Sequence, residues 1–181
     1  MSDAASGLIT QQRYLVFFIR RLFGELTQAI ADLSVEDLNH LPHEHANSIG
    51  FNAWHVFRTA DNVVLFAFER ERPLWVQQGL DAAWGLPRVA QGTGMDPAEA
   101  RALRFPEAAK LTRYAEDVRD EICKRIVAMS DDYLQGITKV NPWGEISRLE
   151  AIGQTVIAHG NGHLGQVSLA RTLLGKPGLD I

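Results

Sequence analysis

The sequence predicts an all-α protein, a four-helix bundle with a long irregular loop between the second and third helices. Two observations favour this fold: four long segments repeat apolar residues at helical spacing, and no stretch alternates strongly enough to require a sheet. A chain of 181 residues has the length of one domain and can bury a substantial core. We therefore expect a single domain over residues 1–181.

The first predicted helix begins at about Thr10, whose hydroxyl can cap the first turn, and ends near Leu33. Its apolar residues recur at steps of three and four: Leu15, Phe18, Ile19, Leu22, Leu26 and Ile30. A short turn then opens at Ser34 and ends at Pro42. The first helix is therefore expected to bury one apolar face.

The second predicted helix runs from Asn47 or Ser48 to Glu71. Its apolar residues do not share one face, which is typical of a helix buried among its neighbours. Arg58 and Asp61 mark the strip of this helix that we expect to face solvent.

Residues 72–104 form the irregular part, which is too long for a simple connection between bundle helices. We expect this loop, with Trp75 and Trp84, to form one wall of a binding site, or to hold a short helix of its own. The third predicted helix begins at Pro106, which suits a first helical turn, and continues to about Met129.

The fourth predicted helix has the clearest start, because Ser147 and Glu150 form the S-x-x-E pattern of a capping box. Gly175, followed by Pro177, is expected to end it.

Composition excludes several classes of function. The net charge is −4 and no basic stripe is visible, so we expect no nucleic-acid partner. The apolar stretch 14–19 is far shorter than the roughly 20 residues that span a membrane, and no secretory signal is visible. The single cysteine, Cys123, fits a reducing compartment, and we expect a soluble cytoplasmic protein. No serine-nucleophile or nucleotide-binding motif is present.

The chemistry-bearing residues lie on the fourth helix, where His159 and His163 are four residues apart and so share one face. They also lie on the inner stripe of the helix, where an unpaired polar group costs on the order of 1–3 kcal/mol. One metal ion bound by both rings would satisfy them together. Hydrogen bonds from two core histidines to carbonyl groups or water are the alternative.

His55, on the second helix, is the histidine best placed to complete a set of three ligands. Asn52, Thr59 and Asn62 are its helical neighbours and could donate or accept hydrogen bonds that orient its ring, unless they line an exposed edge. Gln166 lies one turn after His163 and could also touch the site.

The remaining histidines are expected in a solvated, proline-containing loop: His40, His43 and His45. Glycines crowd the fourth helix and predict close approach of another helix or of a ligand, or simply tight packing: Gly153, Gly160, Gly162 and Gly165.

Several short motifs occur together in a fixed order: Ser48-Ile49, Trp54-His55, Pro142-Trp143-Gly144, His159, His163, Gln166 and Arg171-Thr172-Leu173-Leu174-Gly175. In this combination the chain resembles the DinB/YfiT-like metalloenzymes over nearly its whole length. The resemblance implies an up-down-down-up bundle in which His55, His159 and His163 bind one divalent ion, often nickel or zinc, commonly in a homodimer. It also implies enzymes such as thiol-dependent S-transferases and a mycothiol-dependent isomerase.

The leading hypothesis is therefore a metal-dependent transferase or hydrolase-like enzyme that acts on a small molecule. A transferase of this kind would use a low-molecular-weight thiol. No residue is assigned as the general base. A non-catalytic bundle that binds a metal or small molecule, as a sensor or structural protein, is the alternative, and a metal-free dimerising helical protein is a third. Gly160-Asn161-Gly162 departs from the acidic or bulky residues of the family, which leaves the shape of the substrate pocket open.

Overall fold

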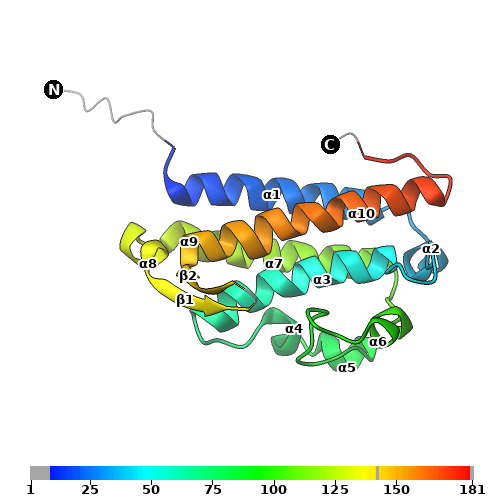
Figure 1. Ribbon diagram of the computed structural model, residues 1–181, viewed down its shortest axis with the longest axis horizontal. Helices are drawn as coiled ribbons and strands as arrows, with labels where there is room; N and C mark the ends of the chain where they lie inside the picture. The colour runs from blue at the N-terminus through cyan, green and yellow to red at the C-terminus, as the bar shows by residue number, and fades with distance from the viewer. Residues whose placement is uncertain (1–8, 142, 180–181) are drawn as a thin grey trace.

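The computed structural model describes residues 9–141 and 143–179, and its framework is a bundle of four long helices (Figure 1). The helices are α1 (Gln11–Ile30), α3 (Ile49–Asp61) extended by the π-helical segment η1 (Asn62–Phe68), α7 (Ala108–Ala128), and α10 (His159–Leu173), which follows α9 (Arg148–Ala151) and the π-helical segment η2 (Ile152–Ala158).

The four helices have the up-down-down-up arrangement. In Figure 1, α1 and α10 run toward the right-hand end of the bundle, whereas α3 and α7 run toward the left-hand end. Both α1 and α3 pack against α7 and against α10. The predicted fold class is therefore confirmed, and the two helices that carry the predicted histidines, α3 and α10, are neighbours.

Shorter elements join the long helices: α2 (Val35–Asn39), α4 (Leu74–Gln77), α5 (Leu80–Trp84), α6 (Pro97–Ala102), α8 (Asp131–Gln135), β1 (Ile137–Val140) and β2 (Gly144–Ser147). The two strands pair as an antiparallel hairpin, with Ile137 opposite Ser147. The sequence did not predict this hairpin, because strands of four residues are too short for alternation to be visible. Pro142, which the family motif includes, lies outside the described residues.

Three of the four predicted helix starts are confirmed by their capping hydrogen bonds. The Thr10 side chain accepts a hydrogen bond from the backbone N–H of Arg13, and that of Ser48 accepts one from Phe51. Ser147 and Glu150 form the reciprocal capping box. The third long helix begins slightly later than predicted, at Ala108.

The end of α10 is fixed by Gly175, whose φ of +76° lies in the left-handed region that glycine adopts without strain. The backbone N–H of Lys176 then donates to the carbonyl of Arg171, six residues back in the Schellman pattern.

The prediction that Arg58 faces solvent is wrong, because its exposed fraction is 0%. Residues of the irregular loop cover this side of α3, and the Arg58 guanidinium donates to the carbonyls of Arg88 and Val89, both at 3.3 Å. The guanidinium also lies 5.1 Å from the centre of the Trp75 ring. Helical periodicity could not show this burial, because the helices of the covering loop are too short to give a readable repeat.

The same prediction is wrong for Asp61, which is also fully buried. Its carboxylate accepts hydrogen bonds from the backbone N–H groups of Leu74 and Trp75 and from the hydroxyl of Tyr114. Burial raises the pKa of this carboxyl, against the lowering effect of these donors. Asp61 therefore anchors the start of the irregular loop to α3 and α7.

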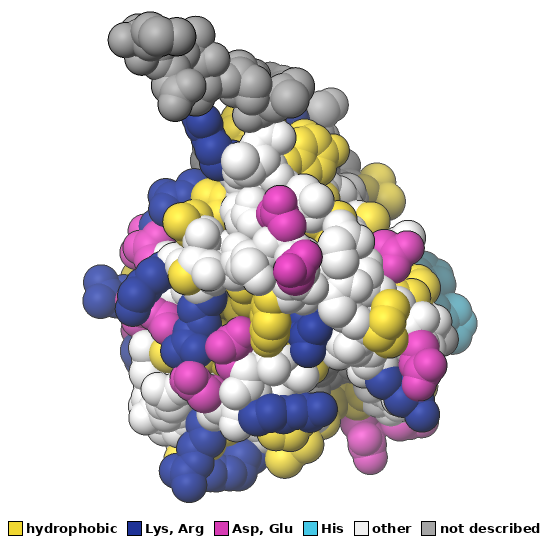
Figure 2. All heavy atoms as spheres, turned by 90° about the vertical axis from the view of Figure 1, so that its left-hand side faces the viewer, with side chains coloured by type: hydrophobic (Ala, Val, Ile, Leu, Met, Phe, Trp, Pro, Cys, Tyr) yellow, Lys and Arg dark blue, Asp and Glu magenta, His cyan; other side chains and the backbone are white. Residues whose placement is uncertain are grey.

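The outer surface carries mixed charge. Figure 2 shows the left-hand end of the bundle, where basic and acidic side chains are interspersed.

Among the described residues no helix is both long and apolar enough to cross a bilayer. Cys123 is buried in α7, as a small apolar residue would be.

Candidate metal centre

The structure brings together the three histidines singled out from the sequence. The Nε2 atom of His159 lies 3.1 Å from that of His55 and 3.1 Å from that of His163. One nitrogen from each ring falls within a cluster whose members all lie within 4.8 Å of one another. Within residues 9–141 and 143–179, this is the one group of histidine, cysteine or acidic side chains so placed.

Close packing of helices places His55 opposite the other two rings. Gly160 follows His159, and a Cβ atom at Gly160 would collide with Leu22 of α1 and crowd Val56 of α3. Gly160 therefore allows close approach of neighbouring helices, one of the outcomes expected from the glycines of this helix. At Gly153, Gly162 and Gly165 an added Cβ would meet nothing within 4 Å, so close packing does not explain them.

The ring of His55 is fixed by residues 88–92, which we call the strap. His55 Nδ1 lies 2.5 Å from the backbone carbonyl oxygen of Gln91, and this oxygen can only accept a hydrogen bond. Gly92 has φ +109°, and a Cβ atom there would lie 2.7 Å from His55 Nδ1 and 2.9 Å from Phe51 Cζ. The strap can therefore reach the ring only because residue 92 is a glycine.

Two side chains of the second helix hold the strap in place. Arg58 donates to its carbonyls at Arg88 and Val89, and Asn62 donates to the side-chain oxygen of Gln91. Arg58 lies about one turn from His55, so the same helix supplies the ring and the support for the carbonyl that orients it.

The other two rings are oriented from their own helix and from α3. His159 Nδ1 lies 3.1 Å from the carbonyl oxygen of Thr155, one turn earlier. His163 Nδ1 lies 3.0 Å from the side-chain oxygens of both Asn52 and Gln166.

These partners determine where the ring protons lie. Because oxygen acceptors face all three Nδ1 atoms, each neutral ring carries its proton on Nδ1 and a lone pair on Nε2. The three Nε2 lone pairs then converge with no proton between them. Two nitrogens about 2.05 Å from one ion at the tetrahedral angle lie about 3.3 Å apart, close to the observed 3.1 Å. The residues therefore fit a cation better than they fit one another.

The protonation equilibria agree with this arrangement. Burial lowers the pKa of His55 to about 4, and burial together with the other two rings lowers the pKa of His163 to about 4. Burial also lowers the pKa of His159. All three rings are consequently neutral at pH 7, the form that coordinates a metal ion.

The side chains predicted to orient the rings have divided roles. Asn52 and Gln166 contact His163, as described above, although Asn52 was expected beside His55. Thr59 and Asn62 form no hydrogen bond with an imidazole in the part of the chain that the structure describes; Asn62 acts on His55 only through Gln91. The reason is that the Nδ1 atom of His55 turns away from its own helix toward the strap.

Sequence reasoning missed the backbone carbonyls of Gln91 and Thr155, because a carbonyl leaves no signature in residue type. The only available signal was the pair of glycines at 92 and 94 within the irregular loop. The rings of His43 and His45 lie 5.4 Å apart on an exposed loop, in agreement with the expectation of a solvated segment.

Two cavities open beside the rings. One, of about 570 Å³, is lined by His55 and His159 together with residues of η1, η2 and the hairpin. The other, of about 310 Å³, is lined by His55 and His163 together with residues of the strap and α6. The predicted wall-forming loop therefore borders both cavities, through residues 91–95 and, for the smaller one, through α6 as well, whereas Trp75 and the partly buried Trp84 line neither.

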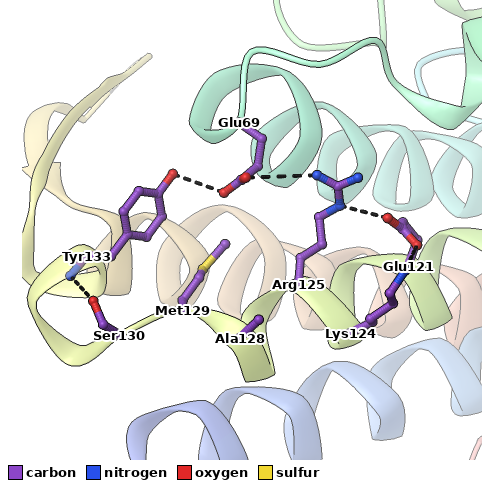
Figure 3. Close-up of a pocket in the computed structure, with 8 residues that line it drawn as sticks. All are labelled: Glu69, Glu121, Lys124, Arg125, Ala128, Met129, Ser130 and Tyr133. Carbon is purple, nitrogen blue, oxygen red and sulfur yellow. Dashed lines mark hydrogen bonds and ion pairs between the residues drawn. The ribbon is translucent and has the colours of Figure 1, made fainter.

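A third cavity, of about 540 Å³, lies between the ends of η1 and α7 and the helix α8, away from the histidines (Figure 3). Its charged groups pair with one another or with neighbours. Arg125 contacts Glu121 at 2.7 Å and both carboxylate oxygens of Glu71 at 2.8 Å, and the Tyr133 hydroxyl donates to Glu69 at 3.0 Å. Of its two cations, Arg125 is therefore neutralised by these pairs, and Lys124 lies 3.6 Å from Glu121.

The fold and the convergent histidines define a class: helical-bundle proteins with a candidate three-histidine metal site. A family model described as the DinB superfamily matches residues 19–167, and the chain belongs to this superfamily.

Solved structures share the fold at low sequence identity. A conserved protein from Enterococcus faecalis is 18% identical, with a TM-score of 0.77 over 93% of this chain and 100% of its own. YfiT from Bacillus subtilis, described as a probable metal-dependent hydrolase with an unusual four-helix bundle topology, is 9% identical, with a TM-score of 0.64 over 97% of this chain and 94% of its own. No curated protein matches the sequence.

Proposed function

We propose that this protein is a metal-dependent enzyme in which His55, His159 and His163 hold one divalent ion, nickel or zinc, and that it transfers a low-molecular-weight thiol to a small electrophile. The observation that carries the proposal is that three unprotonated Nε2 atoms converge beside two cavities. Each of the three rings is oriented by an oxygen atom that faces its Nδ1. The description of YfiT, which shares this fold, as a probable metal-dependent hydrolase supports the metal-dependent part of the proposal and not the transfer of a thiol.

A divalent ion held by three neutral imidazoles would keep its full charge, lower the pKa of a bound water and deprotonate a bound thiol. The chain's own residues fix the three rings: the Gln91 carbonyl, the Thr155 carbonyl and the Asn52 amide oxygen each hold one Nδ1 proton. The larger cavity would receive the electrophile against an apolar wall that includes Val63 and Phe66 and excludes water.

The cavity walls favour thiol transfer over hydrolysis. Metal-dependent hydrolysis commonly uses a carboxylate as general base, and neither wall contains an aspartate or glutamate among the described residues. A thiol needs no such base when it is already ionised. Its sulfur would form a bond to the electrophilic carbon, the leaving group would depart with the bonding electron pair, and the thiol proton would pass to solvent.

Metal analysis of protein purified without a histidine tag tests the first half of the proposal. We expect about one ion per wild-type chain and almost none in His163→Ala, because two ligands bind far more weakly than three. His40→Ala removes a histidine outside the cluster and should keep the full metal content. A wild-type content below about 0.3 ions per chain would favour the metal-free helical protein.

An activity assay tests the second part of the proposal, the transfer of a thiol to an electrophile. The nickel- or zinc-loaded protein is incubated with a thiol and 1-chloro-2,4-dinitrobenzene, and thioether formation is followed by absorbance. Acceleration in the wild type that disappears in His163→Ala supports the transferase. A fully loaded protein that accelerates neither this reaction nor ester hydrolysis would instead support the non-catalytic binding protein. The homodimer and the cytoplasmic location remain predictions.

A further inference from the structure

The two cavities beside the histidines lie on opposite sides of the His55 ring along the bundle. On α3 and η1, Thr59 and Asn62 line the larger cavity, whereas Phe51 lines the smaller one. On the fourth helix, Thr155 and His159 face the larger cavity, and His163, one turn further on, faces the smaller. The converging nitrogens can therefore be approached from two directions.

The strap and the residues after it separate these two spaces. Gln91 and Thr93 line the larger cavity, whereas Gly92 and Met95 line the smaller one. Because Gly92 packs on the His55 ring, this segment forms a partition between the cavities at the level of the ring.

The cavities differ in chemical character. The larger one presents aromatic and aliphatic side chains, including Phe66, Val140 and Trp143, and Lys139 is the one charged side chain among its described lining residues. The smaller one presents polar groups from His45, Asn47 and Arg101, and its volume of about 310 Å³ suits a small polar molecule.

Arg101 supplies the positive charge of the smaller cavity. It is half-buried on α6, and its guanidinium has no ion pair or hydrogen bond with any described residue. Arg125 in the third cavity is the opposite case, since Figure 3 shows it between Glu69 and Glu121. Among the lining residues of the smaller cavity that the structure describes, none is acidic; the exposed Glu44 lies 3.7 Å from His45 Nε2. Arg101 is thus available to an anion from outside the chain.

We propose that the smaller cavity is a carboxylate-binding subsite, in which Arg101 pairs with the carboxylate of an anionic thiol, so that this thiol and an apolar electrophile reach the ion from opposite sides of His55. The inference rests on the proposed function, which supplies the assumption that a thiol sulfur binds the metal ion. Arg101 suits the role because its planar guanidinium can donate two parallel hydrogen bonds to a carboxylate. The uncharged imidazole ligands add no negative charge that would repel it.

The test compares two thiols that differ by one carboxylate, N-acetylcysteine and N-acetylcysteamine. Binding of each to the cobalt-loaded protein is followed by the sulfur-to-cobalt charge-transfer absorption in the near ultraviolet. We expect the wild type to bind N-acetylcysteine about two- to fivefold more tightly, the range of a partly exposed ion pair. Arg101→Gln should lose this preference and bind both thiols equally, whereas Arg101→Lys should keep part of it.

Lys139→Gln is the matched control, because it removes the same charge from the other cavity and should leave the preference unchanged. If Lys139→Gln and Arg101→Gln lose the preference for N-acetylcysteine equally, the preference comes from the overall charge of the protein and not from a subsite, and the proposal is overturned. A wild type that binds both thiols equally would also overturn it, although thiol binding itself would then stand. If neither thiol produces the absorption band in cobalt-loaded protein, the thiol-dependent function fails and the subsite fails with it.

Discussion

Gly92→Ala is the substitution that most directly tests whether the strap orients His55. The new Cβ atom would lie 2.7 Å from His55 Nδ1, whereas an ordinary contact begins at 3.4 Å, so the strap and the ring must separate by 0.7 Å. A shift of that size lengthens the contact between His55 Nδ1 and the Gln91 carbonyl from 2.5 Å to about 3.2 Å, the long end of the range for such hydrogen bonds, and so weakens its hold on the ring. Complete loss of a partner that orients a metal ligand lowers metal affinity by about 10- to 100-fold, so for this weakened partner we expect a loss near the lower end, about tenfold.

The affinity is measured by competition with a chromophoric chelator, and the free energy of unfolding of the metal-free protein by urea denaturation. Alanine at φ +109° is strained as well, so we expect stability to fall by about 1–3 kcal/mol. Gly94→Ala separates the two effects. Gly94 has φ +70° in the same loop, but its Cβ would meet nothing within 4 Å.

Gly94→Ala should therefore lose stability and keep its metal affinity, whereas Gly92→Ala should lose both. If Gly92→Ala binds the ion as tightly as the wild type while its stability falls, the strap does not position His55, and the reasoning from the Nδ1 contacts is refuted. Equal losses of affinity in both variants would point to loop strain alone.

Three further predictions concern stability. Asp61→Ala should lower the free energy of unfolding in urea by about 3 kcal/mol or more, because three buried donors lose their acceptor and Arg58 loses its nearby negative charge; an unchanged midpoint would contradict this. The metal-free protein should lose stability as pH falls from 6.5 toward about 4, because His55 and His163 bind protons in the unfolded chain but not in the folded one. Thermal unfolding across this range should show a lower melting temperature at each lower pH. Ser147→Ala should cost about 1 kcal/mol through loss of the capping box, measured by urea denaturation against an exposed serine-to-alanine change elsewhere.

Local features of this chain were readable from the sequence because they depend on residues within about one helical turn of each other. Thr10, Ser48 and Ser147 cap helices as expected, and His159 and His163 share a face because they are four residues apart. His55 was the histidine best placed on another helix to complete the set, and the family motif includes it, although the periodicity of its own helix could not select it.

Burial of charged residues was not readable from periodicity. The apolar pattern of the second helix left Arg58 and Asp61 as its most polar strip, yet both are fully buried under the irregular loop. The covering loop, with its short helices α4 and α5, lets these two side chains bond to backbone carbonyls and N–H groups, and such partners do not depend on side-chain type.

The sequence by itself determined the bundle, its helix starts and the pair of histidines on one turn, because capping and helical spacing act over a few residues. Only the tertiary structure decided that Gln91, 36 residues away, would orient His55, and that His55 would meet His159 across 104 residues. It also decided that two cavities of different character would flank these rings. Such contacts depend on how close two helices and a loop can pack, which is set at this site by the missing side chains of Gly92 and Gly160.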